Sequence, residues 1–169
     1  MQSYILTAFG ADQPGLVSSL SGLIQENGGN IEESRMLKMG NQFVMNVLIS
    51  LSDTEAQELK MIIKSDKTMQ MQMHPTEKVD SDQITNSKKF KLSGADNEGI
   101  VHSLTKKLAI NNINIIELET FIDLAPISAT PLFNLNATIE LPKNMNESKL
   151  LEILNSHSAK LGVNIELIH

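Results

Sequence analysis

A chain of 169 residues with a net charge of −6 and a single arginine, Arg35, lacks the clustered basic side chains that bind nucleic acid. It has no cysteine, which excludes disulfides and thiolate chemistry and fits a reducing cytoplasm. No apolar run reaches the roughly 18 residues of a membrane span and no secretory signal is recognisable, so we expect a cytoplasmic protein that contacts neither membrane nor DNA.

The first half of the chain predicts the element order β-α-β-β-α-β. Its strands are expected at residues 4–9, 31–39, 42–51 and 69–73, and its helices start near residues 16 and 53. Strand 4–9 is almost wholly apolar, which predicts a central strand buried on both faces. The first helix carries one apolar stripe at helical spacing, formed by Leu16, Val17, Leu20, Leu23 and Ile24.

Short signals mark the ends of these two helices. Pro14 suits the first turn of the first helix because its missing N–H costs nothing there. Gly28 and Gly29 supply a left-handed ending. Ser52 and Glu55 match a capping box, which opens the second helix.

The second half repeats this order after a polar linker at residues 75–88. Its strands are expected at residues 90–93, 114–123, 132–141 and 163–168, and its helices at residues 100–109 and 148–161. In the third strand of each half, apolar and polar residues alternate, which predicts an antiparallel sheet with helices on one face and a wetter opposite face. The sequence therefore predicts an α+β protein of two βαββαβ domains, residues 1–74 and 89–169.

A repeated motif supports this duplication. The sequence GADQPGLV at residues 10–17 returns as GADNEGIV at residues 94–101, and the same offset of 84 residues relates Asn30 to Asn114. A fixed offset over many positions indicates two copies of one small fold, whereas a solenoid needs at least about three repeats.

The two copies differ between their second and third strands. The first has a tight turn at Gly40 and Asn41, whereas the second carries about six extra residues within 124–131, including Pro126 and Pro131. The prolines predict a stiff loop or an extended hairpin. A tolerated surface insertion and a partner-docking or lid role both remain open.

The catalytic inventory is small. No histidine has a His or Cys neighbour at metal-ligand spacing, and no nucleophile elbow is present. We predict no catalytic residue, no metal and no cofactor. Each of the four histidines is expected to be a surface or interface residue: His74, His102, His157 and His169.

The repeated loop is the stronger candidate for a site. Gly15 and Gly99 stand where the backbone passes close to another group or turns with positive φ. The first-turn N–H groups that follow lack intrahelical partners and carry the positive end of the helix dipole, so a carboxylate fits there. Because neither copy has the Gly-x-Gly-x-x-Gly of a dinucleotide loop, a small zwitterion is favoured over a nucleotide.

Polar side chains near the loops could hold the ammonium group of such a ligand. Asp12 and Asp96 could do so or act as helix caps, and Asn30 and Asn114 could do so or act as turn residues. The predicted ligand-binding residues are Asp12, Pro14, Gly15, Leu16, Val17, Asn30, Asp96, Gly99, Ile100, Val101 and Asn114.

The Asp-x-Pro-Gly-Leu-Val sequence at residues 12–17, placed after a strand and opening a helix, resembles the ACT domain, a ferredoxin-like module that senses amino acids. Two such domains in tandem with no catalytic domain attached, together with the strand entry at residues 130–133, resemble the repressor family of the glycine cleavage system. The resemblance implies side-by-side sheets, glycine bound at ACT interfaces near the strand–helix loops, and repression through a DNA-binding activator. The second copy departs from the pattern because Glu98 replaces the proline and adds a negative charge, so the first site is expected to be the working one.

Several functions remain open on the sequence alone. The main hypothesis is a glycine-responsive repressor of glycine cleavage transcription. The alternatives are a protein-interaction module without ligand sensing, and a detached regulatory subunit of an amino-acid or folate metabolic enzyme, since similar ACT units precede formyltetrahydrofolate deformylase. No general base and nucleophile are recognisable together, which argues against an enzyme. Edge strands would allow a homodimer.

Overall fold

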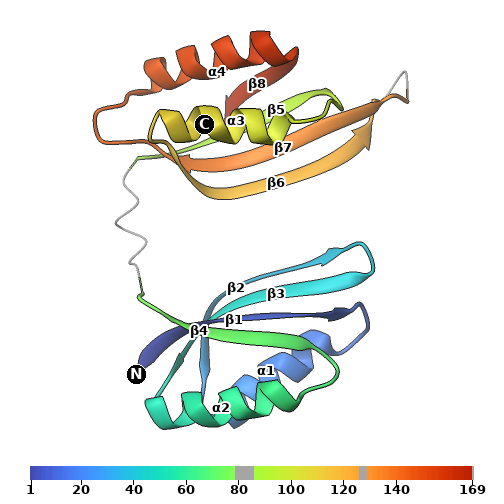
Figure 1. Cartoon of the computed structure of the whole chain (residues 1–169), viewed down its shortest axis with the longest axis vertical. Coiled ribbons are helices and arrows are strands. Elements are labelled where there is room, and N and C mark those ends of the chain that lie inside the picture. The colour runs from blue at the N-terminus through green and yellow to red at the C-terminus, as the bar shows by residue number, and fades with distance from the viewer. Residues whose placement is uncertain (79–85, 126–128, 169) are drawn as a thin grey trace. The chain divides into compact units, whose positions relative to one another are not determined.

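The computed structural model describes residues 1–78, 86–125 and 129–168 and divides the chain into two compact units, Met1–Asp80 and Ser81–His169 (Figure 1). Each unit has its own cluster of buried apolar side chains. Each half therefore has the core that a folded unit requires. Within the described residues, no helix is long and apolar enough to cross a membrane.

The first unit has the predicted order β-α-β-β-α-β. Its elements are β1 (Gln2–Ala11), α1 (Leu16–Glu26), β2 (Asn30–Met39), β3 (Gln42–Leu51), α2 (Asp53–Ser65) and β4 (Gln70–Thr76). The strands form one antiparallel sheet in the order β2-β3-β1-β4, so β1 is an inner strand and β2 is an edge. Both helices cover the same face of this sheet (Figure 1).

The second unit repeats the arrangement. Its elements are β5 (Ser87–Ala95), α3 (Ile100–Ile110), β6 (Asn114–Leu124), β7 (Pro131–Glu140), α4 (Glu147–Leu161) and β8 (Val163–Ile168). The sheet order is β6-β7-β5-β8, which is the order of the first unit shifted by four strands. The prediction of one βαββαβ fold built twice is confirmed.

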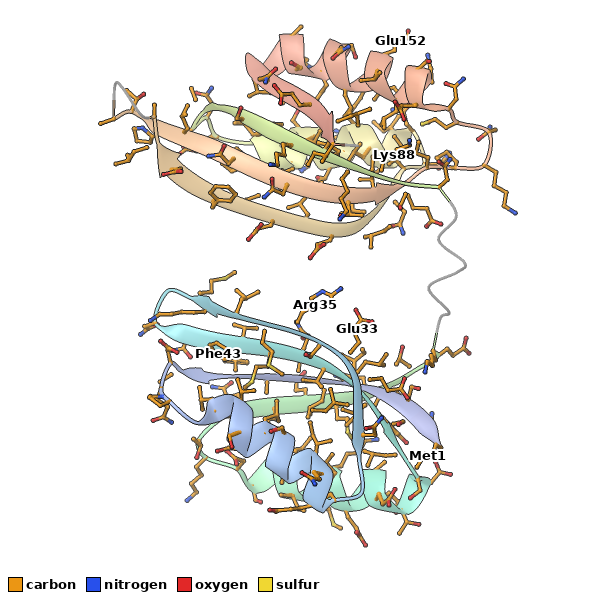
Figure 2. The ribbon with its side chains drawn as sticks, turned by 180° about the vertical axis from the view of Figure 1, so that it is seen from behind. Met1, Glu33, Arg35, Phe43, Lys88 and Glu152 are labelled. Atoms are coloured by element: carbon orange, nitrogen blue, oxygen red, sulfur yellow. The ribbon has the colours of Figure 1, made fainter. Side chains whose placement is uncertain are left out.

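Each sheet buries one face and leaves the other open. On β3, Met45, Val47 and Ile49 are fully buried against the helices, as their alternation predicts. Figure 2 shows Glu33 and Arg35 projecting from the opposite face, where their side chains form an exposed ion pair of 3.0 Å. The open face is therefore the one available to other molecules.

The prediction that the first strand is buried on both faces is wrong. On β1, Tyr4, Leu6 and Ala8 lie in the core, but Phe9 on the other face is 40% exposed. Neighbouring strands cover the edges of an inner strand and not its faces. Since both helices lie on one side, the apolar residues of the other face remain at the surface.

The ends of the first two helices follow most of their sequence signals. Gly28 has φ +76° and donates its N–H to the Gln25 carbonyl, which gives the expected left-handed ending of α1. Ser52 and Glu55 form the predicted capping box of α2. Pro14 is not in the first turn of α1, because the N-cap of this helix is Gly15.

Strands β4 and β5 both extend into the segment that was predicted as the linker, residues 75–88. Pro75 pairs with Tyr4 and so lengthens β4, an edge strand on which a missing N–H is tolerated. Ser87 and Lys88 already pair with β7. The rest of the predicted linker includes residues 79–85, which lie outside the described residues.

The insertion of the second unit begins as an extended hairpin. Strands β6 and β7 pair as far as Leu124 and Pro131, and the Ala125 N–H donates to the Thr130 carbonyl at 2.9 Å. Residues 126–128, which belong to the predicted insertion, lie outside the described residues. A partner-docking or lid role for this hairpin stays a prediction.

One histidine does not lie where the sequence analysis expects it. His157 on α4 is buried, with 6% of its surface exposed, and its Nε2 lies 3.3 Å from the Ser103 hydroxyl of α3. Burial lowers the pKa of His157, and the nearby Lys107 and Lys160 lower it further. This ring is part of the packing between α3 and α4 and not a surface group.

His157 predicts a pH dependence of the stability of the second unit. The unfolded chain takes up a proton on this ring as the pH falls through about 6.5, whereas the folded unit keeps it neutral. Stability is therefore fully present above that pH and declines below it, until the pH reaches the lowered pKa of the folded state. Urea unfolding between about pH 7.5 and about pH 5 should show a smaller loss for His157→Leu than for the wild type. Equal losses would contradict the assignment.

Candidate functional site

The loop between β1 and α1 is shaped by a left-handed residue. Gly15, the N-cap of α1, has φ +95°, which L side chains rarely adopt. Its carbonyl accepts the first helical hydrogen bond from the Ser19 N–H at 2.8 Å. The loop is also tied to the β2–β3 turn, because Asp12 donates its N–H to the Asn41 carbonyl at 3.0 Å.

The start of α1 has no cap from a side chain. The cap interpretation of Asp12 is therefore wrong. Within the described residues, no hydrogen bond satisfies the N–H groups of Leu16, Val17 and Ser18. These amides lie at the positive end of the helix dipole and are open to an anionic group.

An open hollow of about 600 Å³ lies at this helix start. Its apolar wall comes from Pro14, Leu16 and Val17, and Phe43 of β3 closes one side. The prediction that Val17 belongs to the apolar stripe of α1 is wrong for burial, because this side chain is 42% exposed. The remaining lining residues are Asp12, Gln13, Gly15, Ser18 and Ser21.

The Asp12 carboxylate has a partner within the unit. Lys38 of β2 places its ammonium Nζ 2.6 Å from the carboxylate Oδ2 of Asp12, and both side chains are partly exposed. An exposed pair of this kind contributes at most about 1 kcal/mol. A ligand ammonium could displace Lys38 from Asp12 at small cost, but it would compete with this lysine.

Asn30 does not join this group. It begins β2 and pairs with Ser50, which in turn pairs with Ser3 at the opposite end of β1 from Asp12. The ten residues from Ser3 to Asp12 span about 30 Å along the sheet. Within one unit, Asp12 and Asn30 therefore cannot hold the same ammonium group.

Comparison with known families gives a match for the first unit. Residues 2–76, nearly all of that unit, match the family model of the ACT domain. The second unit repeats the same fold strand by strand, so the structure contains two ACT-like units.

The curated relatives match over short segments. The chain is similar to the glycine cleavage system transcriptional repressor of Escherichia coli K12, with 39% identity over 46 residues. This match spans 27% of the chain and only 24% of the length of the repressor. A UPF0237 protein of Methanopyrus kandleri is 33% identical over 55 residues, which are 32% of this chain and 61% of that protein.

Two solved structures match over nearly the whole length. A protein of unknown function from Galdieria sulphuraria is 29% identical, with a TM-score of 0.81 over 98% of this chain and 96% of that chain. A structure provisionally named as a glycine cleavage system transcriptional repressor is 22% identical, with a TM-score of 0.73 over 99% of this chain and 96% of that chain. At this identity the second match shows the shared tandem fold.

The second unit has the same loop conformation with different side chains. Gly99 is the N-cap of α3 with φ +82°, and it too has no side-chain cap, so the cap interpretation of Asp96 is also wrong. Ile100 is buried, whereas Val101 is 36% exposed. Asn114 begins β6 and pairs with Glu140, again at the far end of the sheet.

Two substitutions change the charge around this second loop. Glu98 is an exposed acidic side chain at the position of Pro14, and Ile122 stands where the first unit has Lys38. Asp96 makes no ion pair within the described residues. The loop therefore carries two uncompensated carboxylates beside the helix start, which disfavours an anionic ligand group there.

Sequence reasoning missed Lys38 and Phe43 as neighbours of the loop. Both lie on the β2–β3 hairpin, and only the pairing of β1 with β3 brings that hairpin beside the loop: Ala11 pairs with Gln42, next to Phe43. An available signal was the register implied by the Gly40–Asn41 turn, which places residues 38–43 at the same sheet end as Asp12.

Proposed function

We propose that this chain is a tandem ACT-domain regulator that binds a small amino acid in the hollow beside Gly15. Glycine is the first candidate, and a DNA-binding transcriptional activator is the partner that receives the signal. The role is regulatory and not catalytic, and it operates in the cytoplasm without direct contact between this chain and DNA. Glycine is chosen as the first candidate because the chain is similar to the glycine cleavage system transcriptional repressor.

The observation that carries this proposal is the uncapped start of α1 in an open hollow. The N–H groups of residues 16–18 have no partner within the described residues and face the hollow that Asp12 borders. A free amino acid offers a carboxylate for these amides and an ammonium for Asp12. The apolar wall of Leu16, Val17 and Phe43 can contact a short side chain.

The experiment is calorimetric titration of the full chain with glycine, L-serine, L-alanine and L-leucine. We expect heat for at least one of them, and a rise in unfolding free energy of about 2.7 kcal/mol when the ligand is present at 100 times its Kd. Acetate and methylamine, which each carry one half of the zwitterion, are the matched controls. No heat and no thermal shift with any amino acid would refute amino-acid sensing.

A second candidate function is a protein-interaction module without ligand sensing. The ion pair between Lys38 and Asp12 supports this candidate, because the negative charge of the Asp12 carboxylate is already compensated within the unit. In that case the exposed Val17 and the half-buried Phe43 would contact a partner protein instead of a metabolite. The absence of amino-acid binding in the titration, with the fold intact, would favour this candidate.

A further inference from the structure

The open faces of the two sheets have the same layout but different chemistry. Across the first unit, strand pairing aligns one row of outward-facing residues from β2 to β4: Leu37, Val44, Phe9 and Gln70. The matching row of the second unit, from β6 to β8, is Phe121, Asn134, Ser93 and Asn164. The repeat has replaced two central apolar residues with polar ones.

The exchange of Phe9 for Ser93 leaves space on the second sheet. An open hollow of about 340 Å³ lies over this row. Ser93 is in the middle of it, and its small side chain is flanked by Asn134 and Asn164 on the neighbouring strands. Phe121, which is 44% exposed, supplies an aromatic side at β6. Polar groups and one aromatic wall around a hollow are typical of small-molecule sites.

The amides that line this hollow have unused acceptors. Asn134 donates to the Leu132 carbonyl at 3.2 Å, Asn136 to Glu119 at 3.2 Å, and Asn164 to Glu166 at 2.7 Å. These bonds hold the side chains in place and use one of the two N–H groups of each amide. Among the described residues, nothing donates to the three amide oxygens, so a ligand with several N–H donors could bind them.

Charged groups of both signs complete the lining. Lys91 lies in the next row, aligned with Asn136 and Glu166, and Asp123 lies at the other side of the hollow. In the part of the chain that the structure describes, neither the Lys91 ammonium nor the Asp123 carboxylate makes an ion pair. A ligand with a carboxylate at one end and N–H donors at the other would bind both Lys91 and Asp123.

We propose that the open sheet face of the second unit, centred on Ser93, is a binding site for a free amino acid with a polar side chain. Lys91 would bind the ligand carboxylate, and Glu166, which is aligned with Lys91, would bind the neighbouring ammonium. Asp123 and the asparagine oxygens would accept from the side-chain N–H groups of the ligand. The volume of about 340 Å³ exceeds what glycine would fill, which favours a longer side chain. This site is separate from the hollow beside Gly15, so the two can be tested independently.

The test is a titration of the full ¹⁵N-labelled chain with L-glutamine, followed by amide NMR shifts. We expect shifts at Lys91, Ser93, Asn134 and Asn164. Glutaramic acid, which lacks the ammonium, and 4-aminobutanamide, which lacks the carboxylate, should bind at least about tenfold more weakly. Shifts confined to residues 16–18 would support the proposed sensor site and overturn this one. An absence of shifts at both places would overturn both.

Three variants make the test specific. Ser93→Phe restores the aromatic residue of the first unit, fills the hollow and should reduce glutamine affinity at least about tenfold. Lys91→Gln should lower the affinity by a similar factor because the positive charge is lost. It does not fill the hollow, so it tests the site even if Ser93→Phe fails to fold. Lys89→Gln, an exposed lysine of the same strand outside this hollow, is the control and should bind as the wild type does. Equal affinity in all three variants would overturn the site.

Self-association of this face is the remaining outcome. If the amides of Ser93 and Asn134 broaden with increasing protein concentration and do not shift with glutamine, a second copy covers the face. That result would also overturn the ligand site.

Discussion

Gly15→Val is expected to weaken amino-acid binding by the full chain at least about tenfold, or roughly 1.4 kcal/mol. Gly15 holds φ +95° at the N-cap of α1, and a β-branched residue is strained there, at a cost of about 1–3 kcal/mol. No atom lies within 4 Å of the added Cβ, so the loss comes from backbone strain and not from a direct clash. Relief of that strain would move the amides of residues 16–18 away from the ligand carboxylate.

Gly99→Val is the matched control for this prediction. Gly99 has φ +82° at the N-cap of α3, and an added Cβ there also has no neighbour within 4 Å, so both variants should lose similar stability. Binding should nevertheless survive in Gly99→Val, because Glu98 and Asp96 make the second loop unfavourable for a carboxylate. Calorimetric titration of both variants decides the question. Equal losses, or a larger loss in Gly99→Val, would contradict the asymmetry between the two loops.

Leu20→Ala is expected to lower the unfolding free energy by about 2–5 kcal/mol. Leu20 is fully buried on α1 and packs into the core of the first unit, so its truncation removes apolar contacts and leaves a cavity. In a unit of this size the change corresponds to a fall in the melting temperature of about 10 °C or more. Urea unfolding followed by circular dichroism measures the loss.

Val17→Ala on the same helix separates stability from binding. Val17 is 42% exposed and lines the hollow, so its truncation should change stability by less than about 1 kcal/mol. The substitution removes part of the apolar wall. It should lower the affinity for amino acids with an apolar side chain more than the affinity for glycine. If Val17→Ala destabilised the chain as much as Leu20→Ala, the division of α1 into a core side and a ligand side would be incorrect.

The sequence by itself determined the architecture of this protein. Alternation on β3 and β7, the capping box at Ser52 and the left-handed ending at Gly28 are local signals, and each reflects an interaction within a few residues. The offset of 84 residues then showed that the same set of signals occurs twice. Such features can be read from one chain because their physical cause is close in sequence.

Only the tertiary structure decided which side chains share a site. The alignment of strands placed Lys38 and Phe43 beside the Gly15 loop and Asn30 at the other end of the sheet. The packing of α3 against α4 buried His157. It also showed that a small residue, Ser93, stands where the first unit has Phe9 on an open face. These contacts join residues that are distant in the chain, and they depend on strand register and helix packing, which no local pattern specifies.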